Sequence, residues 1–299
     1  MNSAQRENGK MAIRVWWGEF SGEVGNWNEG HNWLDGAGDD AGDPPVNGDD
    51  VYIVSGSVSI TGYDASAVTL DSLVVGSQYT GTIGSSGAKL QISSTVVDFS
   101  GKGVTYLEGD YVTFTVLDTA TGSTALNISA DGADDITTLR ILGGSGNINL
   151  AASCDLTTIE QIGADGVTLS IAASVDLTGA TLTMDSGIVE MGQAVPTIVV
   201  FGGELKSTID SGTITSIDQY GGRIRWSPTA SCTITTLTVY AGKFDSSNST
   251  APTFTITNTT LHDGELDERS GIENAVYTNP ISTGSAEIKY DAGREITIN

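Results

Sequence analysis

The sequence predicts an all-β protein, a parallel β-solenoid (β-helix) with coils of roughly 20 residues. The first observation is a formula that recurs four times: a ring-bearing residue, a tight pair ending in Gly, then a charged, an apolar and a charged residue. The copies are FGGELK (201–206), YGGRIR (220–225), YAGKFD (240–245) and HDGELD (262–267). Their recurrence, at about 20 residues, is too short for a βαβ unit and typical of one solenoid coil.

A second strand recurs at the same period between these copies. Its markers are Thr-Ile-Thr at 213–215 and 233–235 and Thr-Phe-Thr at 253–255. Further upstream, Asp followed by Ile or Leu and Thr takes this position at 135–137, 155–157 and 176–178, and Gly-led apolar segments begin at Gly146, Gly166 and Gly187. We therefore expect two strands and two turns in every coil, with stacked coils burying one continuous apolar column.

The charged–apolar–charged triplets have the period of a β-strand, so their apolar residue should face the core and its neighbours water. The predicted core residues are Leu205, Ile224, Phe244 and Leu266. Stacking places the charges in two columns, Glu204–Arg223–Lys243–Glu265 and Lys206–Arg225–Asp245–Asp267. Opposite charges are adjacent at three of the six steps, so the columns are partly self-compensated. We expect solvated charges here; a partner surface carrying acids is the alternative.

The N-terminal region, residues 11–50, is expected to be a Trp-rich cap or anchoring segment. Four of the five Trp lie within it. They either close the open edge of the first coil or bind another protein, and the candidate partner-binding residues are Trp16, Trp17, Trp27 and Trp33. An acidic loop at 35–43 could bind calcium, but its spacing matches no full calcium motif, so we predict no metal site and no cofactor.

The other boundaries follow from the repeat. Residues 1–10 are expected to be a disordered tail, and they lack the apolar segment of a secretory signal. Residues 51–275 form the predicted solenoid, with a looser period up to Leu107. Residues 276–299 are C-terminal strands whose open edge is a candidate contact in a homo-oligomer.

Composition excludes several classes of function. The net charge is −24, from 37 acids and 13 bases, and Arg140 is the only base between Lys102 and Lys206. Nucleic-acid binding is therefore not expected, because phosphate contacts need clustered Lys and Arg. No apolar stretch reaches the roughly 18 residues of a spanning helix, so no membrane contact is expected either. The acidity indicates solubility and resistance to self-association.

The two cysteines, Cys154 and Cys232, each precede a strand of the second kind. Counting coils places them four apart, or about 19 Å at about 4.8 Å per coil. A disulfide needs Cα atoms within about 7 Å of each other. We therefore expect two buried, reduced thiols, as in a protein that folds in a cytoplasm.

Catalysis is the alternative to a structural role, because polysaccharide lyases and glycosidases also use β-solenoids. The best constellation is Arg223 and Arg225 near Asp218 and Asp245. A glycosidase needs two carboxylates, one with a raised pKa, and 37 acids produce such pairs by chance. The two histidines, His31 and His262, have no Ser or Cys partner at a motif position. We therefore predict that the protein is not an enzyme and has no catalytic residue.

The segment from Asn26-Trp27 through Asn32-Trp33 to Gly-Asp-Asp-Val at 48–51, followed by Gly-Gly-charged-apolar coils, resembles the β-helical proteins of bacteriophage virions. It is also similar to the strand repeats of autotransporter-like surface proteins. The reduced cysteines and the lack of a secretion signal favour the phage side.

The resemblance implies a non-enzymatic virion protein, made in the host cytoplasm and homotrimeric. Such a protein decorates and cements the capsid or forms a tail-associated fibre, and its N-terminal segment binds a major capsid or tail protein. Its short length and 7% aromatic content differ from tailspike depolymerases. The alternatives are a β-helix that binds or cleaves a surface polysaccharide, and a secreted adhesin.

Overall fold

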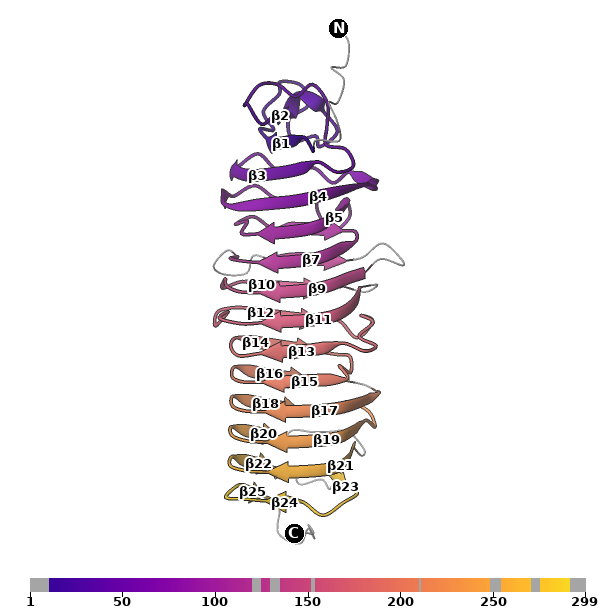
Figure 1. Ribbon diagram of the computed structural model, residues 1–299, viewed down its shortest axis with the longest axis vertical. Helices are drawn as coiled ribbons and strands as arrows, with labels where there is room; N and C mark the ends of the chain where they lie inside the picture. The colour runs from indigo at the N-terminus through magenta and orange to yellow at the C-terminus, as the bar shows by residue number, and fades with distance from the viewer. Residues whose placement is uncertain are drawn as a thin grey trace.

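The structure, a computed structural model, describes residues 11–119, 125–129, 135–151, 154–209, 211–247, 254–269 and 275–290. These residues wind into one rod of about ten coils of roughly 21 residues, with the N-terminal cap at one end (Figure 1). Every strand pairing between successive coils is parallel in this part of the chain. The predicted all-β parallel solenoid with a Trp-rich cap is confirmed.

Each coil contributes to two series of strands. The first series comprises β3 (Asp50–Gly56), β4 (Asp64–Tyr79), β5 (Leu90–Phe99), β7 (Tyr111–Val116), β9 (Asp135–Ile141), β11 (Asp155–Gln161), β13 (Thr181–Met184), β15 (Thr197–Val200), β17 (Thr213–Gln219), β19 (Thr233–Val239) and β21 (Phe254–Leu261), with β23 (Ala275–Tyr277) and β24 (Ser282–Thr283) beside β21. The second series comprises β6 (Thr105–Glu108), β8 (Ala125–Ser129), β10 (Asn147–Leu150), β12 (Thr168–Ile171), β14 (Ile188–Met191), β16 (Glu204–Ser207), β18 (Arg223–Trp226), β20 (Lys243–Asp245), β22 (Glu265–Asp267) and β25 (Glu287–Lys289).

The core is an uninterrupted inner column of apolar side chains. In the second series Leu205 pairs with Ile224, which is followed by Phe244 and Leu266, and all four are fully buried. The column continues upstream through Val189, Leu169 and Ile148, and downstream to Ile288. The predicted inward positions are confirmed. The stacking also runs past residue 275, since β25 pairs in register with β22.

The longer strands of the first series bend near their middle. In β17 the buried residues are Ile214, Ile217 and Gln219, so the alternation slips by one residue, and pairing with β19 skips Thr215. One strand therefore supplies two sides of the coil. This bend explains how a coil with such a long strand closes with only two strands.

One predicted register is wrong. Thr213 pairs with Thr233 as expected, but Thr233 pairs with Thr255, and Ile256 lies beside Ile234. The coil from Thr233 to Thr255 is therefore longer than the preceding one, whereas the repeated triplets suggested equal lengths. A shift of two residues keeps the same side chains inward, so Phe254 is buried as well. Thr253 lies outside the described residues.

The predicted state of the cysteines is confirmed. Cys154 and Cys232 are both buried, and neither is in a disulfide bond. They precede β11 and β19, which are four strand steps apart. Burial raises the pKa of the Cys232 thiol to about 11, so this thiol is protonated at neutral pH. The predicted tail (1–10) and residues 291–299 of the predicted C-terminal strands lie outside the described residues.

Candidate functional site

The cap closes the first coil by extending its sheet. Strand β1 (Ile13–Trp16) pairs in parallel with β3 and antiparallel with β2 (Trp33–Leu34), which follows the short 3-10 helix η1 (Gly30–Asn32). The carbonyl of Gly25 accepts the N–H of Thr61 at 2.9 Å. A side chain at Gly25 would be blocked, because its Cβ would lie 2.4 Å from the Ser59 carbonyl oxygen. The cap is therefore seated directly on the first coil and covers its exposed edge.

The four candidate tryptophans have different environments. Trp16, Trp27 and Trp33 are buried and pack edge to face, with ring centroids 4.9 Å apart for Trp16–Trp33 and 4.6 Å apart for Trp27–Trp33. The indole N–H of Trp33 donates to the Trp27 carbonyl at 2.8 Å. Trp17 alone of the four is exposed, at 46%.

The partner-binding prediction is therefore corrected for Trp16, Trp27 and Trp33. Their rings form the interior of the cap, and these residues are at most 5% exposed. For Trp17 it stays a prediction. The alternation in Ile-Arg-Val-Trp-Trp, which sends neighbouring residues to opposite faces, was the available sequence signal that Trp16 and Trp17 differ.

The acidic loop at 35–43 uses its carboxylates to hold its own turns. Asp35 Oδ1 accepts the N–H groups of Ala37 and Asp39 at 2.8 and 3.0 Å. Asp40 accepts the N–H of Gly42 and bonds His31 Nδ1 at 2.6 Å, which lowers the pKa of Asp40 and raises that of His31. Within the described ranges, no group of three or more His, Cys, Asp or Glu side chains could hold a metal ion.

The ring-bearing residues of the repeat form a stack on the outside of the rod. We call Phe201, Tyr220, Tyr240 and His262 the ring column. Successive centroids are 5.0, 4.5 and 4.7 Å apart, and successive planes are within 16° of parallel. All four rings are exposed. The sequence identified these residues but did not predict that their faces would cover one another.

The glycine two positions after each ring permits this stacking. Gly222 and Gly242 have positive φ angles of 65° and 86°. A Cβ at Gly242 would lie 2.4 Å from the carbonyl oxygen of Gly222 in the preceding coil. The turns therefore stack backbone on backbone, which fixes the spacing of the rings.

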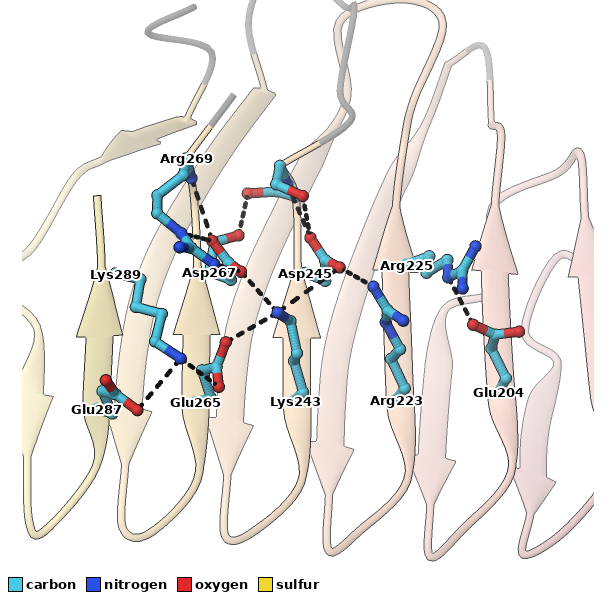
Figure 2. A network of polar contacts seen from close by, with 12 residues as sticks. Glu204, Arg223, Arg225, Lys243, Asp245, Glu265, Asp267, Arg269, Glu287 and Lys289 are labelled. Atoms are coloured by element: carbon cyan, nitrogen blue, oxygen red, sulfur yellow. Dashed lines mark hydrogen bonds and ion pairs between the residues drawn. The ribbon is translucent and has the colours of Figure 1, made fainter. Parts of the chain in front are cut away.

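The two predicted charge columns begin three residues after each ring in the sequence, and they form a network that we call the ion ladder (Figure 2). Lys243 Nζ lies 2.6 Å from Asp267 and 2.8 Å from Glu265, and Lys289 Nζ lies 2.8 Å from Glu265. Arg223 pairs with Asp245. Further pairs include Arg225–Glu204 (2.5 Å), Arg269–Asp267 (2.7 Å) and Lys206–Glu190 (3.0 Å). Several pairs cross between the columns, so compensation is more complete than the column order predicted.

Two acids of the ion ladder are buried, which corrects the expectation of solvated charge. Asp245 and Asp267 are only 3% and 2% exposed. Strands β20 and β22 end at these residues. The Asp245 carboxylate accepts the backbone N–H of Ser247 at 3.0 Å, and the Asp267 carboxylate accepts that of Arg269 at 3.3 Å. Their sequence context gave no sign of this, because it depends on the turn that follows.

The ion pairs also determine the protonation of these acids. Burial acts to raise the pKa of Asp245, but hydrogen bonds from Ser247 and Arg223 outweigh it and lower the pKa overall. The Arg269 side chain, with Lys243, lowers the pKa of Asp267. Hydrogen bonds from Lys243 and Lys289 lower that of Glu265. All three are ionised at neutral pH.

The constellation with the best catalytic pattern is divided by the structure. Arg223 is engaged by Asp245 and Arg225 by Glu204. Asp218 lies on β17, in the other strand series, between Val199 and Thr238. A general acid in a glycosidase needs a raised pKa, and that of Asp245 is lowered. The arrangement favours a structural role for these charges.

The wider comparisons leave the family open. Comparison with models of protein families, with curated proteins and with solved structures found no match to this chain. The helix η1 has three residues, and the described ranges contain no helix of the length and apolar character needed to cross a membrane.

Proposed function

We propose that this chain is a non-enzymatic structural protein of a bacteriophage virion, a rod attached through its N-terminal cap to a major capsid or tail protein. The observation that carries the proposal is the ion ladder. Its Arg and Lys side chains, which include the best candidates for a catalytic base, join one coil to the next. The charged side chains on this face therefore hold the coils of the rod together. Assembly would take place in the host cytoplasm, consistent with two free thiols.

The cap supplies the attachment surface in this proposal. It lies at one end of the rod (Figure 1), and Trp17 within it exposes nearly half of its surface. Exposed Trp residues are favourable anchors at protein interfaces, because burying a large ring excludes much water. The three buried Trp residues give the cap the rigidity that such an anchor needs.

The proposal is tested by co-sedimentation of the purified protein with virions, and separately with purified capsids and tails. We expect the intact chain to bind one of the two, and Trp17→Asp to reduce binding at least tenfold without changing the melting temperature. Val24→Asp is the matched control, since Val24 is also an exposed apolar residue of the cap. Equal binding by the intact chain and Trp17→Asp would reject attachment through this residue.

Activity on polysaccharide is the second arm of the test. The proposal predicts no release of reducing ends from host capsule or lipopolysaccharide. Depolymerisation that is abolished by Arg223→Ala would overturn it and support an enzyme.

Polysaccharide binding is a second candidate, favoured by an open cleft of about 330 Å³ between the cap and β4. Trp27, Pro44, Pro45, Tyr63 and Asp64 are among the residues that line it. The ring column is a poorer platform, because each inner ring has both faces covered by neighbours. Calorimetric titration with host glycans, using Tyr63→Ala as the variant, distinguishes this candidate from the first.

A further inference from the structure

Two tyrosines of the ring column are stacked face to face on successive coils. Tyr220 directly follows β17 and Tyr240 directly follows β19, and these two strands pair in register up to Gln219 and Val239. The ring centroids are 4.5 Å apart, and the ring planes are 3° from parallel. The two side chains therefore occupy equivalent positions one coil apart.

The hydroxyl groups of these two tyrosines lie at the same end of the stack. Desolvation is the main cause that raises the pKa of Tyr220, and the charge of Tyr240 and a hydrogen bond with its hydroxyl raise it further. Because the hydroxyls are neighbours and the planes are parallel, each ring carbon next to a hydroxyl-bearing carbon lies over its equivalent in the other ring. The distance between these ortho carbons is close to that between the centroids.

Both phenols are accessible from solvent at their edges. Tyr220 is 44% exposed and Tyr240 is 37% exposed, although neighbouring rings cover their faces. Their outer neighbours in the ring column are Phe201 and His262, which carry no phenol. The ring column therefore contains two phenols, and they are adjacent.

We propose that Tyr220 and Tyr240 are an oxidative modification site, at which a one-electron oxidant, such as a peroxidase with hydrogen peroxide, joins them as dityrosine. Each phenol loses one electron and one proton, and the two phenoxyl radicals combine through a new bond between their ortho carbons. Each of these carbons then releases its proton while each oxygen takes one up, which restores both phenols. Overall the pair loses two hydrogen atoms, and one hydrogen peroxide is reduced to two water molecules.

The solenoid favours this reaction because it holds the two reacting groups together. An encounter between two radicals becomes a step within one molecule, which is faster when the groups are already aligned. The rings must still approach each other more closely than 4.5 Å. A small tilt is sufficient for this, and exposed side chains move on a picosecond to nanosecond timescale.

The new bond would connect two coils of the rod covalently. Positions 220 and 240 are 20 residues apart, so the bond closes a loop and restricts the unfolded chain in the way that a disulfide does. Neither cysteine of the chain is in a disulfide bond, so dityrosine would supply a covalent link that the thiols do not. The inference does not rest on attachment to a virion, and its test has a separate readout.

The test is oxidation of the dilute, full-length protein with a peroxidase and hydrogen peroxide. We expect dityrosine fluorescence, an intact mass that is lower by two hydrogen atoms, and no increase in the size of the protein. Trypsin separates the two tyrosines into the peptides 207–223 and 226–243, so the crosslink should appear as these two peptides joined. The crosslinked protein should unfold at a higher urea concentration than untreated protein.

Three variants and a denatured sample show whether stacking directs the reaction. Tyr220→Phe and Tyr240→Phe keep a ring in the column but remove one phenol, so each should lose the crosslink. Tyr290→Phe is the matched control and should retain it, because Tyr290 is 45% exposed and lies outside the ring column. Protein oxidised in urea should lose the preference for this pair.

The oxidant is checked in parallel on N-acetyltyrosine amide, so that a lack of reaction in the protein is informative. The proposal is overturned if the native protein forms no dityrosine under conditions that couple this small phenol. It is also overturned if the crosslink joins separate chains, persists in Tyr220→Phe or Tyr240→Phe, or forms equally well in urea. An unchanged urea midpoint in the crosslinked protein would reject the stabilising role of the bond.

Discussion

The central coils, residues 125–200, and the C-terminal coils, residues 204–289, share one interior and differ on the outside. Ile148 and Leu169 in the first region are as fully buried as Ile224 and Phe244 in the second. Among the described residues, one ion pair, Arg140–Glu160, lies within 125–200, whereas the ion ladder links successive coils throughout 204–289. In the second strand series, the outward positions of β10 and β12 instead carry neutral Asn, Thr and Ser residues, and the Asn149 side-chain amide donates to the Asn127 side-chain oxygen at 2.9 Å.

This difference separates the interactions that maintain the coil from those that vary on its outer surface. The inner column is common to both regions, so it is sufficient to define the fold. The outer ladders differ, so they tune stability and contacts without changing the architecture. Changes inside should therefore have the same effect in both regions, and changes outside should affect only one.

The largest expected effect is the loss of an inner residue. Ile224→Asp in the C-terminal coils and Ile148→Asp in the central coils should each cost about 4 kcal/mol or more, because both bury an unpaired carboxylate. Thr235→Ser, at an outward position, should cost well under about 1 kcal/mol. Denaturant unfolding of the three variants measures this. A much smaller effect at Ile148 than at Ile224 would break the claim of a common interior.

The next largest effect is expected at low pH, which should destabilise the C-terminal coils more than the central coils. The pKa values of Asp245, Glu265 and Asp267 are lowered in the folded state, whereas unfolded carboxyls titrate near pH 4. Their stabilisation is therefore present above about pH 4 and is lost as the pH falls through the lower folded-state values. In the central coils, hydrogen bonds from Thr178 lower the pKa of Asp176, but this contact lies within one turn and joins no coils.

Hydrogen exchange provides the measurement. At low pH, amides of β20 and β22 should lose protection before those of β10 and β12, after correction for intrinsic exchange rates. A double variant, Asp245→Asn with Asp267→Asn, should lose most of this pH dependence. Equal loss of protection in both regions would remove the proposed role of the ion ladder.

A smaller effect is expected from removing the charge of a single acid of the ion ladder. Asp267→Asn should cost about 1–3 kcal/mol, because it removes charge-assisted hydrogen bonds from Lys243 and Arg269 to a buried side chain. Asp263→Asn, in the exposed turn before β22, should cost less than about 0.5 kcal/mol. Thermal melts at pH 7 compare the two. Similar melting temperatures would mean that the ion pairs contribute little at this site.

The smallest difference between the two regions is expected at their cysteines, Cys154 in the central coils and Cys232 in the C-terminal coils. Denatured protein should show two free thiols, and native protein should react slowly with a thiolate-selective reagent, because burial raises the pKa of Cys232 to about 11. Reducing and non-reducing electrophoresis after alkylation should be identical. A recovered Cys154–Cys232 bridge would contradict the four-coil separation.

The solenoid, the inner column and the charge columns could be predicted from the order of residues. These features depend on two short periods, alternation along a strand and recurrence of about 20 residues between coils, and both are visible in the order of residues. The sequence alone therefore predicts that the core contains Leu205, Ile224, Phe244 and Leu266. The register of Thr255 does not follow from the sequence, because a coil that is longer by two residues leaves the alternation intact.

Which of these residues contact one another depends on how the chain folds in three dimensions. Three of the four N-terminal Trp residues are buried because β1 and β2 fold back over the first coil. Asp245 and Asp267 are buried because the chain turns immediately after them and directs its N–H groups at their carboxylates. The rings stack because glycines bring successive turns into backbone contact. Each outcome depends on the path of a turn, and turn paths follow from contacts between coils, which local patterns do not encode.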